Sequence, residues 1–138
     1  MFLTEQDYMA VVDQRALDVI TQANSQNRES AEASAVEEIA GYLRPKYDCG
    51  AIFSATGEER NKKIVQVACD ISLYHLVSSV PAKMGYELRK ERYDAAIKWL
   101  EGVASGKITP DLPLATSEDG TTATPLRWGS ATRLDNIW

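Results

Sequence analysis

The sequence predicts an all-α protein, a small helical bundle of about four to five helices with an extended C-terminal arm. Two observations predict this class. Apolar residues recur at helical spacing through long segments such as residues 64–80 and 93–104. After Ile108 the composition changes to Pro, Thr, Ser, Asp and Gly, which favours extended chain. A chain of 138 residues fits one domain with a real core, so we predict a helical domain at residues 1–108 and an arm at residues 109–138 that becomes ordered on assembly.

Two short helices are expected at the N-terminus. Thr4 is placed to cap the first, residues 5–12, and Asp7 stands three positions later, where it can complete a capping box and favour the positive helix end. Residues 15–21 predict a second short helix with Leu17 and Ile20 on one side. The polar residues 22–27 predict a loop.

A longer third helix is expected over residues 28–44. Its apolar positions repeat at i, i+3, i+4 and i+7: Val36, Ile39, Ala40 and Leu43. Pro45 disfavours helical backbone at the preceding residue and ends the helix there. The other faces carry four glutamates: Glu29, Glu32, Glu37 and Glu38. No Glu-x-x-His motif accompanies them, so a solvated face is expected rather than a metal site.

The remaining helices follow a loop. Residues 48–61 contain two glycines and little periodicity, which predicts a loop with a short extended piece at 51–53. Residues 60–80 predict the most apolar helix, ended by Pro81. The last helix covers residues 83–107. Its apolar stripe is Tyr93, Ile97, Leu100 and Ala104, and Gly106 is placed to stop it.

The stretch "VACDISLYHL", residues 67–76, raises the question of a reactive or metal-binding cluster. Because a helix turns about 100° per residue, Cys69 and His75 point about 120° apart, and Asp70 and His75 about 140° apart. These side chains therefore do not converge, and a Cys–His nucleophile pair is denied its hydrogen-bond reach. The segment is apolar around most of its circumference, which indicates an interior helix, and Cys69 is expected to act as a small core residue.

Asp70 is the polar exception within this buried helix. An internal carboxylate without a partner is costly, so we predict a link from Asp70 to an arginine of another helix. Arg44, Arg89 and Arg92 are the candidates, and the predicted polar core comprises Asp70, Arg44 and Arg89.

Composition excludes several classes of function. A net charge of −5 weighs against a protein that binds nucleic acid by neutralising phosphates. Cys49 and Cys69 lack CxxC spacing and are expected to be free thiols in a reducing cytoplasm. The start has no signal-peptide pattern and no apolar run approaches the ~20 residues of a membrane span. No phosphate loop, GxSxG or HExxH motif is present, so we expect no enzyme activity, cofactor or metal.

The end of the chain carries apolar residues that an isolated tail would expose at a cost. We predict that it packs either back on its own domain or on a neighbouring subunit. The residues assigned to this subunit-interface arm are Arg127, Trp128, Arg133, Leu134, Ile137 and Trp138. Buried tryptophans supply large contact area, and the two arginines are expected to meet acidic surfaces such as Glu37 and Glu38.

Four segments together resemble one family: "FLTEQDY" at the start, "EEIAGYLRPKY" at 37–47, "VACDISLYHL" at 67–76 and "ERYDAAIKWLEGVASGKI" at 91–108. In this order they resemble the head–tail connector, or head-completion, proteins of Mu-like phages and prophages. The resemblance covers most of residues 1–108. The segments at 22–30 and 54–62 carry no inference.

The resemblance implies a small helical adaptor with no catalytic activity. Such adaptors form a ring, dodecameric in the virion and often monomeric in isolation, beneath the portal protein at the head–tail junction. The ring extends the DNA channel, close to DNA without sequence-specific contacts, and docks the next neck or tail protein; it forms in the host cytoplasm and binds no membrane. The alternatives from the residues are a small helical interaction module of a prophage, a thiol enzyme using Cys49 or Cys69, and a helix-turn-helix DNA-binding protein.

Overall fold

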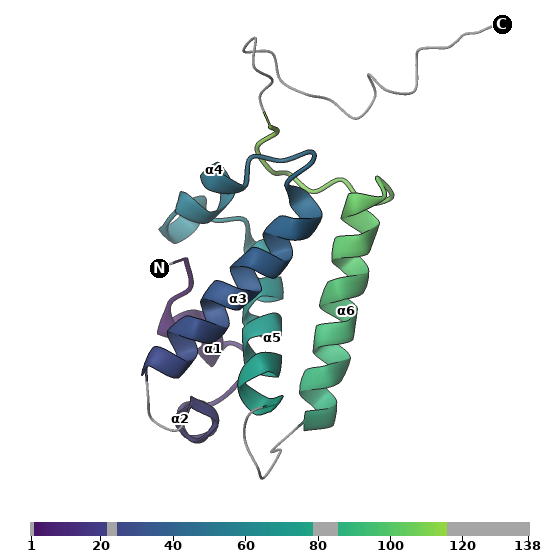
Figure 1. The fold of residues 1–138 in the computed structure, drawn as a ribbon. Helices are drawn as coiled ribbons and strands as arrows, with labels where there is room; N and C mark the ends of the chain where they lie inside the picture. The colour runs from purple at the N-terminus through teal and green to yellow at the C-terminus, as the bar shows by residue number, and fades with distance from the viewer. Residues whose placement is uncertain (1, 22–24, 79–85, 116–138) are drawn as a thin grey trace, which may run out of the picture.

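The computed structural model describes residues 2–21, 25–78 and 86–115, which form six α-helices and one 3₁₀ helix, with α5 at the centre (Figure 1). The elements in order are α1 (Glu5–Met9), α2 (Gln14–Thr21), α3 (Ser25–Leu43), α4 (Cys49–Ser54), η1 (Gly57–Glu59), α5 (Lys62–Ser78) and α6 (Tyr86–Ala104). The predicted all-α class is confirmed. No helix of the described residues combines the length and the apolar character that crossing a membrane requires.

Local signals explain where the N-terminal helices begin. The Thr4 amide donates to Asp7 Oδ2 over 2.7 Å, which is the predicted capping arrangement of α1. Asp13 then caps α2, since the Ala16 amide donates to its Oδ1 over 2.8 Å. The predicted loop at 22–27 is partly wrong, because α3 already begins at Ser25.

Helix α4 differs from the sequence-based expectation of a loop with an extended piece at 51–53. The Asp48 carboxylate accepts the Ala51 amide over 3.1 Å and caps the helix. Ile52 is buried, and the Phe53 ring meets the Phe2 ring edge-on with 5.0 Å between centroids. Tertiary packing therefore stabilises a short helix that has no periodicity long enough to reveal it.

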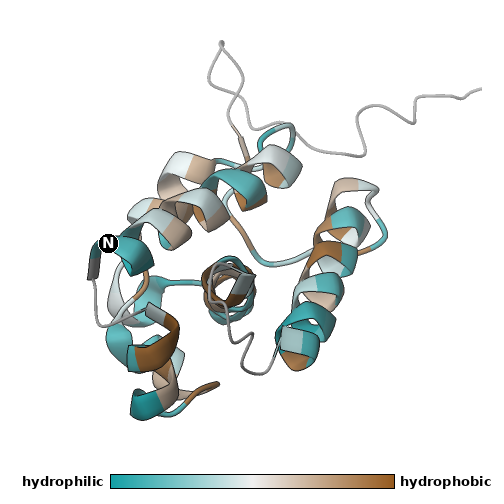
Figure 2. Ribbon diagram, turned by 60° about the horizontal axis from the view of Figure 1, so that its bottom comes forward, coloured by the Kyte–Doolittle hydropathy of each residue, from teal (hydrophilic) through white to brown (hydrophobic). Residues whose placement is uncertain are grey.

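Helix α5 provides the centre of the core. Figure 2 views it almost along its axis, with α3 and α6 on different sides of it. Ten of its residues are buried, and Cys69 is only 1% exposed. The prediction of an interior helix, with Cys69 as a core residue, is confirmed.

The chain after α6 turns back onto the domain. Gly106 adopts φ 86°, a left-handed conformation that favours glycine, and the Ile108 amide then donates to Gly102 O over 3.0 Å. Leu112 is buried, and Leu114 forms an isolated antiparallel bridge with Tyr47. Packing thus continues past the predicted domain boundary at residue 108, through at least the last described residues.

Candidate functional site: a groove beside helix α1

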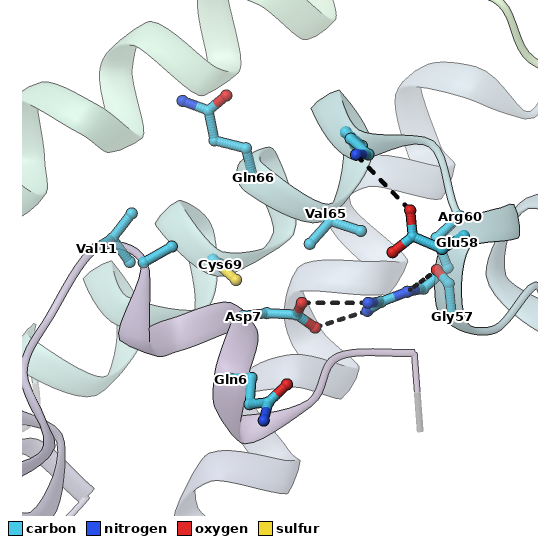
Figure 3. A pocket seen from close by; sticks show the side chains of 11 residues that line it. Gln6, Asp7, Val11, Gly57, Glu58, Arg60, Val65, Gln66 and Cys69 are labelled. Atoms are coloured by element: carbon cyan, nitrogen blue, oxygen red, sulfur yellow. Dashed lines mark hydrogen bonds and ion pairs between the residues drawn. The ribbon is translucent and has the colours of Figure 1, made fainter.

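A groove of about 300 Å³ separates α1 from the start of α5 and the η1 segment (Figure 3). Its lining comes from three parts of the chain: Gln6, Asp7, Ala10 and Val11 of the α1 region, Gly57, Glu58 and Arg60 of the η1 region, and Lys62, Val65, Gln66 and Cys69 of α5.

One ion pair fixes the width of the groove. Arg60 Nη1 lies 2.6 Å from Asp7 Oδ2, and each side chain is only 13% exposed. The same Nη1 donates to Phe2 O over 2.8 Å, and Arg60 Nε donates to Gly57 O over 3.0 Å. Burial acts to raise the pKa of Asp7, but hydrogen bonds from Arg60 and Thr4 outweigh it and hold that pKa below its usual value. The pair therefore stays charged and rigid at neutral pH.

The floor of the groove is apolar and chemically inert. Ala10, Val11 and Val65 contribute methyl groups to the lining, and Figure 3 shows Cys69 between Val11 and Val65. Burial raises the pKa of Cys69 far above its usual value, so the thiol stays protonated and lacks the nucleophilicity of a thiolate. The arrangement suits binding of an apolar side chain with a polar rim around it.

The predicted link between Asp70 and an arginine is present, and Arg92 is the partner. Arg92 Nε donates to Asp70 Oδ1 over 2.7 Å and Nη2 to Oδ2 over 3.4 Å, which ties α5 to α6. Burial raises the pKa of Asp70, although hydrogen bonds and charge from Arg92 oppose the shift. The prediction that Arg44 belongs to the polar core was wrong, because its side chain is 59% exposed and pairs with Glu37 at 3.2 Å.

Arg89 is buried, as predicted, but its hydrogen bond goes to the loop after α1. Its Nη2 donates to Val11 O over 3.4 Å, at the edge of the groove beside α1. The charges of Asp70 and Arg92 both act on it, and burial lowers its pKa. Arg89 thus connects α6 to the loop after α1 rather than forming the direct bond to Asp70.

Two of the glutamates on α3 depart from the expected solvated face: Glu32 is buried and Glu38 is half-buried. The Glu32 side chain is 5% exposed, and its Oε1 accepts the Tyr8 hydroxyl over 2.8 Å. Glu38 accepts from the Tyr93 hydroxyl over 2.7 Å and lies 3.2 Å from His75 Nε2. Both carboxylates connect α3 to other helices, a role that the sequence pattern does not signal because their partners are 24 to 55 residues away.

The polar residues of "VACDISLYHL" go to separate partners. Cys69 faces the groove beside α1, Asp70 faces Arg92, and His75 faces Glu38. Among residues 2–21, 25–78 and 86–115, no group of three or more metal-ligating side chains is gathered.

The predicted interface arm lies outside the described residues. This applies to all six residues assigned to it: Arg127, Trp128, Arg133, Leu134, Ile137 and Trp138. Of the two acidic residues suggested as their partners, Glu38 is engaged within the domain, whereas the Glu37 side chain is 73% exposed. Sequence reasoning also missed the groove beside α1, because Arg60 and Asp7 are 53 residues apart.

Comparison with known proteins identifies one family. The family model described as "Bacteriophage Mu, Gp36" matches residues 2–126, which covers the whole helical domain and the start of the C-terminal segment. No curated protein and no solved structure matches the chain.

Proposed function

Because the chain belongs to the bacteriophage Mu Gp36 family, and so is a Mu-like phage protein, we propose that it is a structural protein of the virion, a head–tail connector. Copies of the chain form a ring beneath the portal protein, extend the DNA channel and dock the next neck or tail protein. Its place is then the head–tail junction, reached after assembly in the host cell, and its role involves no catalysis.

The family match across 125 of 138 residues carries this proposal. The helical domain has a property that suits it. Ion pairs and hydrogen bonds join α1 to η1, α3 to α1, α3 to α6, and α5 to α6. A subunit whose helices are tied in this way keeps one shape, and closing a ring requires the same rotation at every step.

We assign the C-terminal segment to the contact between neighbouring copies. Ala115, the last described residue, still contacts the domain, because its amide donates to Lys46 O over 3.0 Å. The 23 residues beyond it include Trp128 and Trp138. A fully extended segment of this length could span up to about 75 Å, and we propose that it binds the groove beside α1 of the next copy, whose apolar lining fits an aromatic side chain.

Two variants test this function. Deleting residues 126–138 removes the aromatic end, and Ala10→Trp fills the groove from an exposed lining position. We expect both to leave the domain folded, by circular dichroism, while complementation of a phage lacking this gene falls at least tenfold. Electron microscopy should then show filled heads and free tails, because joining fails.

The matched control is Ala104→Trp, which adds the same ring at an exposed position of α6 outside the groove. It should complement like the wild-type protein. Gold-labelled antibody should mark the head–tail junction of complete particles. Labelling elsewhere, or complete particles formed without this protein, would contradict the connector function; normal joining with both variants would contradict the role of segment and groove alone.

A further inference from the structure

We propose that two unlike faces of the domain bind each other between copies: a basic groove around Trp99 on one copy and an acidic face of α1 and α2 on the next. The inference rests on the connector function and adds to it the body-to-body contact of the ring. A contact between two different faces of identical subunits is heterologous, which is the kind that builds rings.

The basic face is a groove of about 660 Å³ along the C-terminal half of α6. Trp99 and Ile108 form its apolar floor, and Gly102 provides its depth. A methyl group at Gly102 would lie 2.6 Å from Ile108 Cδ1, so the Ile108 side chain would have to shift if Gly102 were replaced. The rim carries three lysines, Lys63, Lys98 and Lys107, with Glu101 as the single acidic residue of the lining.

The lysines of this rim have charge to offer a partner. All three are exposed, and within the described part of the chain none of them forms an ion pair. The Lys63 ammonium lies 5.5 Å from the centre of the Trp99 ring, a cation–π contact that keeps one positive charge above the indole. A partner surface with carboxylates around an apolar centre would fit this groove.

The face formed by α1 and α2 has this complementary chemistry. Gln14 Nε2 donates to Glu5 Oε1 over 3.2 Å and to Asp18 Oδ1 over 2.9 Å, so two exposed carboxylates from different helices converge on one amide. Arg28 Nη1 comes no closer than 4.0 Å to Glu5 Oε1, at the limit of an ion pair, so a cation from another molecule would add favourable interactions with both carboxylates. Met9 and Val19, 44% and 48% exposed, supply apolar area on the same two helices.

The acidic and basic side chains are also divided unequally between the two parts of the sequence to which these faces belong. Up to residue 61 the chain has eleven acidic and five basic side chains, whereas described residues 62–78 and 86–108 have five acidic and seven basic ones. Figure 1 shows α2 and the C-terminal end of α6 at opposite corners of the domain. Opposite charge on opposite sides favours head-to-tail association and disfavours association of identical faces.

Sedimentation equilibrium of the full chain tests the contact. Protein concentrations from about 0.05 to about 1 mM detect association as weak as a Kd of about 1 mM, which fits a chain that is monomeric when dilute. We expect self-association that weakens with added salt. The K98E/K107E variant and the E5K/D18K variant should each lose it by at least tenfold in Kd, while an equimolar mixture of the two, and the fourfold variant, should regain it.

The matched control is R44E/K90E, which makes the same change in net charge as K98E/K107E, lies outside both faces and outside the groove beside α1, and should associate like the wild-type chain. A wild-type chain that stays monomeric up to about 1 mM, or reversed-charge variants that do not recover on mixing, would overturn the inference. The connector function is judged separately by antibody labelling of particles, so either idea can fail while the other stands.

Discussion

Two contacts between helices, which we call the α5–α6 seam and the α1–α3 seam, each contain a buried carboxyl group, Asp70 and Glu32 respectively. The two seams differ in the group that faces the carboxylate. Between α5 and α6, Asp70 faces the guanidinium of Arg92, with a shortest contact of 2.7 Å. Between α1 and α3, Glu32 accepts the phenol of Tyr8 over 2.8 Å, and its nearest cation, Arg28 Nε, lies 3.4 Å away on its own helix. One seam is an ion pair across helices, and the other is a hydrogen bond from a neutral donor.

This difference determines what each seam contributes. In the ion pair, removal of one partner leaves a buried charge uncompensated. In the Tyr8–Glu32 seam, the carboxyl group can take up a proton and remain bonded, because burial raises the pKa of Glu32. Burial also raises the pKa of Asp70, so both seams respond to pH. The α5–α6 seam is the one expected to be sensitive to loss of its partner, because its carboxylate depends on a cation from another helix.

The largest effect should come from Arg92→Ala. The Asp70 side chain, 7% exposed, would lose its cation and stay enclosed. We expect a loss of about 2–3 kcal/mol in the free energy of unfolding, less than the ~3–5 kcal/mol of a fully enclosed pair because Arg92 is 32% exposed to water. Urea denaturation at pH 7 measures it.

The double variant Asp70→Asn/Arg92→Ala is the control for that result, because it removes the stranded charge as well. It should recover at least half of the stability lost in the single variant. If the double variant is as unstable as Arg92→Ala, the loss comes from the packing of the arginine stem rather than from an uncompensated charge.

The Tyr8–Glu32 seam should show its character through pH. Because burial raises the pKa of Glu32 above 4.5 in the folded state, the folded protein binds this proton more tightly than the unfolded chain. Stability from this group is thus present at low pH and is lost as pH rises through the folded pKa. Glu32→Gln keeps an acceptor for the Tyr8 hydroxyl and abolishes the titration.

We expect Glu32→Gln to lie within about 1 kcal/mol of the wild-type protein at pH 7, with the difference moving in favour of the wild type as pH falls towards 4.5. Urea denaturation of both proteins at several pH values measures this difference. A constant difference across that range would show that the folded domain does not shift the titration of Glu32.

Local sequence rules predicted those parts of the fold that depend on neighbouring residues. The cap at Thr4, the apolar helix with Cys69 inside, and the stop at Gly106 all follow from signals within a few positions. Helix α4 did not, because its stability comes from contacts such as the Phe2–Phe53 ring pair across 51 residues. Tertiary contacts overrode weak local preference there.

The site was predictable only in part, for a related reason. A carboxylate in a buried helix is costly without a partner, and this cost alone predicts the link from Asp70 to an arginine. Which arginine supplies it depends on how α6 rotates against α5, which no spacing within either helix specifies. The burial of Glu32 and the groove bordered by Arg60 and Asp7 likewise depend on how α1 packs against the rest of the domain.

The smallest effect should come from Arg44, which was expected in the polar core and lies on the surface. Its contact with Glu37 joins two side chains that are 59% and 73% exposed, and water screens a pair of this kind almost completely. We expect Arg44→Ala to change the free energy of unfolding by less than about 0.5 kcal/mol, measured in the same urea titrations as Arg92→Ala. A loss approaching that of Arg92→Ala would mean that exposure does not separate the two arginines, and the contrast between surface and buried pairs in this domain would have to be abandoned.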